Sequence, residues 1–246
     1  MILDTALLLA AAFAAGALNA VAGGGSFLTL PALVLTGVPA VTANATGTLA
    51  LLPGYLSGAW ALRRETQTPP GLPLRRLLVV SILGGACGAA LLLWTPDATF
   101  RRVVPWLLLA ATLLFALGPR LAGRAHDRNP HPVGAVAGVF AVTAYGGYFN
   151  GGVGILLLAL FGLLGQTSLL AANGLKNLVS VLLTSIAVAL YIAGGLIAWR
   201  EAGLMMGAAL LGGYLGARGA RRLPANWLRH GIVATGLTMS AMFFLR

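Results

Sequence analysis

Apolar residues form long, nearly unbroken runs along this chain, and short polar connectors separate the runs. Most runs approach the length of about 20 residues that a membrane-spanning helix needs. They cover residues 5–22, 27–36, 40–62, 75–94, 101–118, 133–149, 153–165, 168–198, 203–220 and 227–245. The pattern therefore predicts an all-α fold, a polytopic transmembrane helical bundle.

The same pattern occurs twice, once in each half of the chain. A glycine-rich run at residues 23–26 returns at residues 151–154, and a short apolar segment follows each run. Asn44 and Asn173 then lie near the start of the next long helix, at matching distances from the glycines. We therefore predict two membrane repeats and a cytoplasmic connector between them. Their bounds are 1–120 for the first repeat, 121–132 for the connector and 133–246 for the second repeat.

The two short segments, 27–36 and 153–165, span only about half of the hydrocarbon thickness as helices. Each segment either continues the preceding helix after a break or turns back as a re-entrant half-helix. Continuation gives parallel repeats and divides the basic residues nine to six between the two faces, whereas re-entry gives inverted repeats and divides them eleven to four. Because positive charge marks the cytoplasmic side, we favour inverted repeats with both termini outside.

Composition supports a membrane protein and excludes several other classes. Hydrophobic residues make up 59% of the chain and charged residues only 9%, whereas soluble domains are about a quarter charged. The net charge of +11 comes from arginines in the connectors, which orient membrane proteins, so we expect no nucleic-acid partner. Cys87 is the only cysteine and the three histidines form no cluster, so we expect no metal or other cofactor. Asp4 precedes the first run, where a signal peptide would carry positive charge, so this run is interpreted as an uncleaved helix.

The two glycine-rich breaks are the main candidates for a binding site. A broken membrane helix is tolerated only where protein buries it or a cavity solvates it. The half-helix that follows has free N–H groups and a partial positive charge at its start, which suits an anion. Paired breaks in two repeats indicate a transporter's midplane site, although close helix packing is the alternative use of such glycines. The candidate residues from the breaks are Gly23, Gly24, Gly25, Ser26, Asn150, Gly151, Gly152 and Gly154.

Lys176 gives this candidate site its charge. It is the only lysine and has no acidic residue within twenty positions. A cation at mid-bilayer costs about 3 kcal/mol or more, so either a substrate anion pairs with it or the side chain snorkels to the headgroups. Asn44, Thr48, Asn173 and Asn177 are further candidates because they could hydrogen-bond the same oxyanion, with bonding between helices as the alternative. All five acids lie at segment ends, which disfavours proton coupling through a buried carboxylate and leaves Na⁺ coupling or passive flow open.

The residues around both breaks resemble the TauE/SafE sulfite exporter family. In the first half the resemblance lies in residues 22–33 and 37–46, and in the second half in residues 150–154 and 172–177. It covers nearly the whole chain. The first half departs from the family pattern because Gly47-Thr48 stands where relatives carry Asn-Lys, so this half lacks a cation that relatives have.

The resemblance implies a transporter that exports a small sulfur-containing anion, such as sulfite, thiosulfate or an organosulfonate. We expect this anion to bind at mid-membrane between the half-helix N-termini. An anion channel and an intramembrane enzyme are the alternatives. No span holds a histidine that could serve Ser26 as a base, so we expect no enzyme. The expected partners are the anionic substrate and the lipid bilayer, in a bacterial inner membrane, with a homodimer as the assembly to test.

Overall fold

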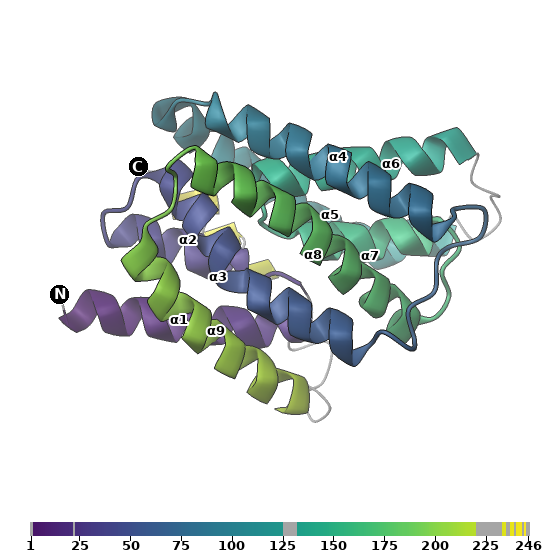
Figure 1. The fold of residues 1–246 in the computed structure, drawn as a ribbon, viewed down its shortest axis with the longest axis horizontal. Helices are drawn as coiled ribbons and strands as arrows, with labels where there is room; N and C mark the ends of the chain where they lie inside the picture. The colour runs from purple at the N-terminus through teal and green to yellow at the C-terminus, as the bar shows by residue number, and fades with distance from the viewer. Residues whose placement is uncertain are drawn as a thin grey trace.

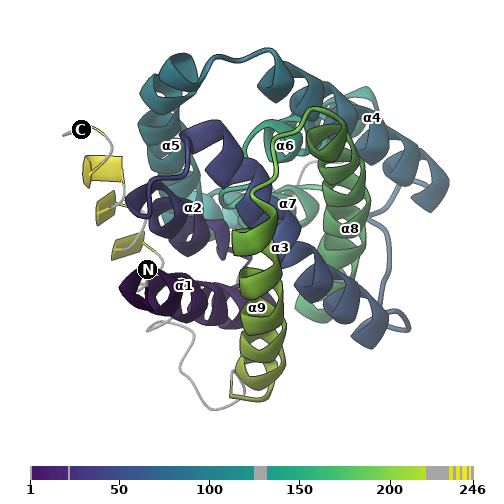
Figure 2. The same cartoon turned by 60° about the vertical axis from the view of Figure 1, so that its left-hand side comes forward.

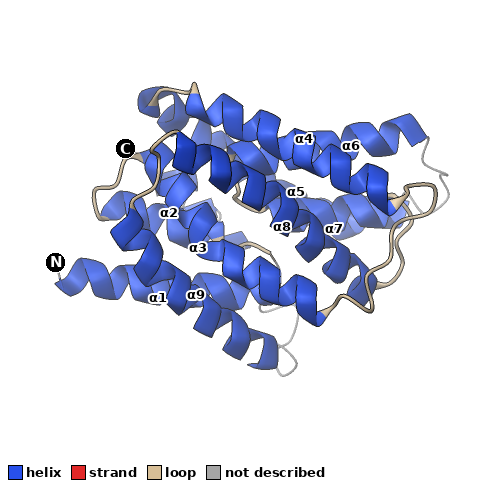
Figure 3. Cartoon of the chain, viewed as in Figure 1, coloured by secondary structure: helices blue, strands red, loops and turns tan. Residues whose placement is uncertain are grey.

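The computed structural model describes residues 2–21, 23–124 and 132–219, together with scattered residues between 233 and 244. Throughout this part of the chain the regular structure is helical (Figure 3), which confirms the all-α prediction. The helices are α1 (Ile2–Val21), α2 (Ser26–Leu35), α3 (Ala40–Ala61), α4 (Leu74–Leu93), α5 (Asp97–Arg124), α6 (Pro132–Tyr148), α7 (Val153–Leu163), α8 (Leu169–Ala193) and α9 (Trp199–Gly219).

The helix boundaries follow the predicted apolar runs to within a few residues, and the two largest differences are at the ends of α5 and α8. α5 continues to Arg124, inside the predicted connector, because Arg, Leu and Ala dominate its last residues and favour helix. α8 ends at Ala193 rather than at residue 198, because two glycines follow and Gly195 adopts φ +69°, which ends a helix. Residues 125–131 of the connector and most of the last predicted segment lie outside the described residues.

The chain turns back at each glycine-rich break. A Cβ atom on Gly25, at the start of α2, would lie 2.6 Å from the carbonyl oxygen of Ala15 in α1. In the second half, a Cβ atom on Gly138 of α6 would lie 3.0 Å from a methyl group of Leu160 in α7. Each short helix therefore folds back along the helix before it and does not continue that helix.

Helices at equivalent positions of the predicted repeats make matching contacts. α1 packs on α9, α4 packs on α6, and α3 packs on α8. By their order in the two halves, α1 is equivalent to α6 and α4 is equivalent to α9. The contact between α1 and α9 therefore corresponds to the contact between α6 and α4. Equivalent helices also run in opposite directions, since α1, α3 and α9 run from left to right in Figure 1 while α6, α8 and α4 run from right to left. In Figure 2, α3 crosses the middle of the bundle between α8 and α9.

Glycines outside the breaks bring the paired helices together. Gly16 of α1 lies against the backbone of Ala209 in α9, and Gly88 of α4 lies against the backbone of Ala144 in α6. A side chain at either position would meet the partner's backbone. Small residues are the usual device for close helix packing in membranes, so these glycines have a structural explanation that does not involve a ligand.

The outer surface of the bundle suits a lipid environment. Leu83 of α4 is 58% exposed and Leu211 of α9 is 61% exposed, with no polar face around them. Trp60, Trp94 and Trp199 are exposed at helix ends, where tryptophans mark membrane–water interfaces. By length and composition, three of the described helices could each cross a membrane, over Ile2–Ala20, Leu74–Leu93 and Leu170–Ala193.

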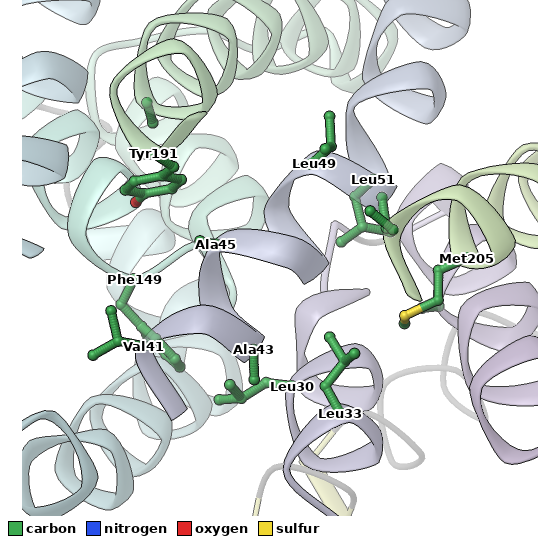
Figure 4. Close-up of a cluster of buried hydrophobic side chains, with 14 of the residues drawn as sticks. Leu30, Leu33, Val41, Ala43, Ala45, Leu49, Leu51, Phe149, Tyr191 and Met205 are labelled. Atoms are coloured by element: carbon green, nitrogen blue, oxygen red, sulfur yellow. The ribbon is translucent and has the colours of Figure 1, made fainter. Parts of the chain in front are cut away.

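The first half of α3 lies at the centre of a buried apolar cluster (Figure 4). Leu30 and Leu33 of α2 pack on it from one side, and Met205 of α9 packs on it from another. Phe149, which lies within the second break, is completely buried in the same cluster, and Tyr191 of α8 lies close to it. The two halves therefore both contribute to this cluster, and Phe149 anchors the second break in it.

Asp97 links the start of α5 to the start of α3, and its removal should destabilise the protein moderately. Its carboxylate accepts a hydrogen bond from the N–H of Val41 at 2.9 Å and pairs with Arg101 at 2.8 Å. We expect Asp97→Ala to lower the free energy of unfolding by about 1 kcal/mol, as the loss of a helix cap does. Arg101→Ala, which removes only an exposed ion pair, should cost less than about 0.5 kcal/mol. Thermal unfolding of the purified variants measures both, and equal losses would show that the cap contributes nothing.

Candidate functional site

The two glycine-rich breaks meet inside the bundle. Gly23 and Gly154 are in direct contact, since a Cβ atom on either would lie 2.9 Å from the Cα atom of the other. Gly23 has φ +82° and Gly152 has φ +76°, a left-handed conformation that favours glycine. Phe27 of α2 fills the space beside Gly152, and Gly24 contacts Ile155 of α7. The starts of α2 and α7 are therefore brought together.

The starts of these two half-helices differ from the starts of the long helices that follow them. At the start of α3, the N–H of Val41 donates to the carboxylate of Asp97. At the start of α8, the Ser168 hydroxyl accepts from the N–H of Ala171 at 3.2 Å. Among the described residues neither α2 nor α7 receives a side-chain cap, although backbone carbonyl oxygens already accept from N–H groups in both first turns, those of Phe27 and Ile155 among them. Their first N–H groups thus carry the partial positive charge of a helix start without a side-chain acceptor.

Lys176 lies beside this meeting point. Its Cδ atom would be 3.3 Å from a Cβ atom on Gly154, and its side chain is fully buried, with 0% exposure. Within the described part of the chain its ammonium nitrogen has no hydrogen-bond partner. Snorkelling would require the side chain to reach the surface, but it remains inside the protein. In the same part of the chain no three His, Cys, Asp or Glu residues gather into a metal site.

Two hydrogen bonds connect the halves next to the breaks. The Ser26 hydroxyl donates to the Asn150 carbonyl oxygen at 3.2 Å, and the Asn44 amide donates to the Tyr148 carbonyl oxygen at 3.1 Å. The Asn150 side chain is buried, and both its amide nitrogen and its amide oxygen lack hydrogen-bond partners among the described residues. A buried amide of this kind is available to a ligand or a water molecule.

Some predicted site residues have their polar groups already bonded. The Thr48 hydroxyl donates to the Asn44 carbonyl oxygen within α3 at 2.7 Å, so Thr48 does not offer a free donor. The Gly151 carbonyl oxygen accepts from the Tyr145 hydroxyl at 2.7 Å, and Gly25 packs on α1.

The asparagines near the start of α8 lie on the side of that helix that meets α3. The Asn177 amide packs against Gly58 of α3. Gly174, next to Asn173, packs against Leu62 at the end of α3. The Asn173 oxygen is buried and lacks a partner within the described residues.

Five further buried polar residues lie in the same region or on the same helices, and they are absent from the residues predicted from the sequence. The Tyr55 hydroxyl lies near the amides of Asn19 and Asn150. Unpaired side-chain oxygens are also present at Asn19, Thr29, Ser180 and Thr184. The sequence spacing could have identified Ser180 and Thr184, because they follow Lys176 at intervals of four residues and so share its helix face.

Comparison with known proteins gives consistent matches along nearly the whole chain. The family model described as "Sulfite exporter TauE/SafE" matches residues 8–243. A "Probable membrane transporter protein" of Haemophilus influenzae is 32% identical over 96% of this chain and 92% of its own length. "Probable membrane transporter protein ORF9" of a Sinorhizobium species is 30% identical over 87% and 80%, and the Escherichia coli protein YfcA, also named a probable membrane transporter, is 28% identical over 94% and 86%. No solved structure matches.

Proposed function

Since the chain belongs to the sulfite exporter TauE/SafE family, it is a membrane transporter and not an enzyme, and we propose that it exports a small sulfur-containing anion. Sulfite, thiosulfate and organosulfonates are the substrates to test. The family's description supports the chemical class, and the buried lysine at the site supports a negative charge independently. The bacterial sources of the relatives support an inner-membrane location.

One observation carries the proposal: two half-helix starts without side-chain caps meet beside a buried, unpaired lysine. Gly23 and Gly154 bring the starts within contact distance, and Lys176 lies against Gly154. Three sources of positive potential thus converge where the surrounding spans carry carboxylates only near their ends. An oxyanion bound there would accept hydrogen bonds from backbone N–H groups of both repeats and would neutralise the lysine.

We also propose that residues 1–120 and 133–246 are inverted repeats and that both termini lie outside. The opposite directions of equivalent helices in Figure 1 support this arrangement. The re-entrant half-helices support it too, because they place the arginine-bearing ends of α3, α4 and α5 at one end of the bundle. That end, where α5 ends and α6 begins, would face the cytoplasm under the positive-inside rule.

The transport cycle in this proposal moves one repeat against the other around the bound anion. The two repeats touch where Gly23 contacts Gly154. In this conformation Lys176 is completely buried, so the site is closed to both sides of the membrane. An exchange between two open conformations would expose the site to each side in turn, as in other transporters built from inverted repeats.

Uptake of anions into proteoliposomes tests this function. We expect saturable flux of one or more of sulfite, thiosulfate and sulfoacetate, and little flux of non-sulfur carboxylates such as acetate and succinate. Saturation would separate a transporter from an open channel. If only carboxylates were transported, the proposed substrate class would be wrong, and if flux rose linearly without saturation, the alternating-access mechanism would be wrong.

A further inference from the structure

Some buried hydroxyl groups in the described helices bond within their own helix, and others have no partner. In the first group, the hydroxyl donates to the carbonyl oxygen four residues earlier in its own helix, at 2.7 Å, as in Thr48, Ser81, Thr112 and Thr143. Ser180 and Thr184 of α8 belong to the second group. Both are 0% exposed, and neither hydroxyl has a hydrogen-bond partner among the described residues. A buried polar group left unpaired costs about 1–3 kcal/mol, so both hydroxyls are available to a ligand.

These two hydroxyls lie in line with Lys176. Residues four apart on a helix lie on the same face, about 6 Å apart along the axis. Lys176, Ser180 and Thr184 therefore form one row on α8, and all three side chains are completely buried and unpaired. The row begins beside Gly154, at the meeting point of the breaks, and extends toward the end of α8.

The charge around the row selects an anion as its ligand. α8 packs against α3, α4, α6 and α7. None of these five helices contains an aspartate or a glutamate, and apart from the arginines at the start of α4 their ionisable groups are Lys176, Cys87 and tyrosines, among them Tyr55, Tyr145 and Tyr191. A cation would meet the charge of Lys176 without any carboxylate to offset it, whereas an oxyanion could accept hydrogen bonds from both hydroxyls.

We propose that Ser180 and Thr184 form a second binding station for the transported anion, on the path between the Lys176 site and the end of the bundle where α9 begins. This inference rests on the proposed function. In the proposed topology that end faces outside, so an exported anion would pass from Lys176 to the two hydroxyls before release.

The first repeat has no such station. The positions equivalent to Ser180 and Thr184, by the register that aligns Asn44 with Asn173, are Leu51 and Tyr55. Leu51 is apolar and 1% exposed, and Tyr55 lies near Asn150 in the central region. The equivalent positions of the first repeat therefore do not carry a matching pair of unpaired serine and threonine hydroxyls, so accessibility of the station should differ between the two membrane faces.

Cysteine labelling tests the station directly, because Cys87→Ala yields a protein without cysteine. In that background we would introduce Ser180→Cys and Thr184→Cys, with Ser81→Cys and Thr143→Cys as matched controls whose hydroxyls are equally buried but bonded within their own helices. Each full-length variant in proteoliposomes would be treated with sulfonatoethyl methanethiosulfonate, an anionic reagent, and separately with the trimethylammonium analogue, a cationic one.

We expect the anionic reagent to modify the thiols of the Ser180→Cys and Thr184→Cys variants at least about tenfold faster than the cationic reagent, as an electropositive path requires. A transported anion should slow this modification, and the two control thiols should stay unmodified. Equal rates with both reagents, faster modification by the cation, or no modification of the two station thiols would each overturn the station. Denaturation in detergent followed by labelling verifies that every thiol is present.

A transport measurement covers the case in which a cysteine variant does not fold, and it separates the two proposals. Thr184→Val keeps the volume of the side chain and removes the hydroxyl, so we expect it to raise KM severalfold. Thr184→Ser retains the hydroxyl and should keep KM near that of the natural protein. Thr143→Val should leave KM unchanged. If Thr184→Val transports normally while loss of the Lys176 charge abolishes flux, the station is wrong and the proposed function stands. If the loss of that charge has no effect, the proposed central site itself is wrong.

Discussion

Lys176→Met is expected to abolish transport of the sulfur anion while the protein still inserts in the membrane. Methionine keeps the unbranched chain as far as Cε, and with it the contact with Gly154, but removes the charged amine. Removing one partner of a buried, hydrogen-bonded charge pair costs about 2–5 kcal/mol. At about 1.4 kcal/mol for each factor of ten, transport at low substrate concentration should fall at least about thirtyfold. Initial uptake rates in proteoliposomes, normalised to inserted protein, measure this loss.

The same substitution should stabilise the empty protein. Without a bound anion, Lys176 is a buried cation with no partner in the described part of the chain, which is unfavourable in a membrane. We therefore expect Lys176→Met to raise the thermal midpoint of the ligand-free transporter and to eliminate the stabilisation that added sulfite or thiosulfate gives the natural protein. A residue that lowers stability but is required for activity is the expected signature of a binding site.

Arg200→Met provides the matched control for Lys176→Met. Arg200 is exposed near the start of α9, so its replacement removes the same charge from the chain without affecting the buried site. Transport should be nearly unchanged. Normal transport by Lys176→Met, or an equal loss in both variants, would contradict the role assigned to Lys176.

The fold could be predicted from the sequence wherever a single segment contains the signal. Apolar runs long enough to cross a membrane, and glycines that interrupt them, predicted the helices from α1 to α9 and the two breaks. The match between Asn44 and Asn173 also held, since each is the fifth residue of its helix. Loop charge favoured the re-entrant alternative, and the reversal of the chain at Gly25 agrees with it.

The site was less predictable because it depends on side-chain rotamers and on contacts between helices that are distant in the sequence. Thr48 and Thr184 are both threonines inside buried helices, yet the hydroxyl of Thr48 bonds to its own helix and that of Thr184 does not. The sequence contains no signal for that difference, because either rotamer is compatible with a helix. Contact between Gly23 and Gly154 likewise depends on how the two halves dock, which a motif within one half does not specify.

Gly23→Ala is expected to cause the largest loss of structure among single-methyl changes at the breaks. Gly23 has φ +82°, which costs a residue with a Cβ atom about 1–2 kcal/mol. The added methyl group would also lie 2.9 Å from the Cα atom of Gly154, so the two half-helix starts would have to separate. We expect transport to be lost even when folded protein remains, because the starts of α2 and α7 would no longer converge on one anion. The thermal midpoint and initial uptake rates measure the two effects.

Gly37→Ala separates conformational strain from the contact between the breaks. Gly37 has φ +90°, close to that of Gly23, but a Cβ atom there would have nothing within 4 Å. It should therefore show the strain alone, as a modest decrease in the thermal midpoint with transport retained. The additional loss in Gly23→Ala would then measure what the Gly23–Gly154 contact contributes. If the two variants lost stability and transport equally, the breaks would need only their backbone conformation, and close approach of the half-helix starts could not be the basis of anion binding.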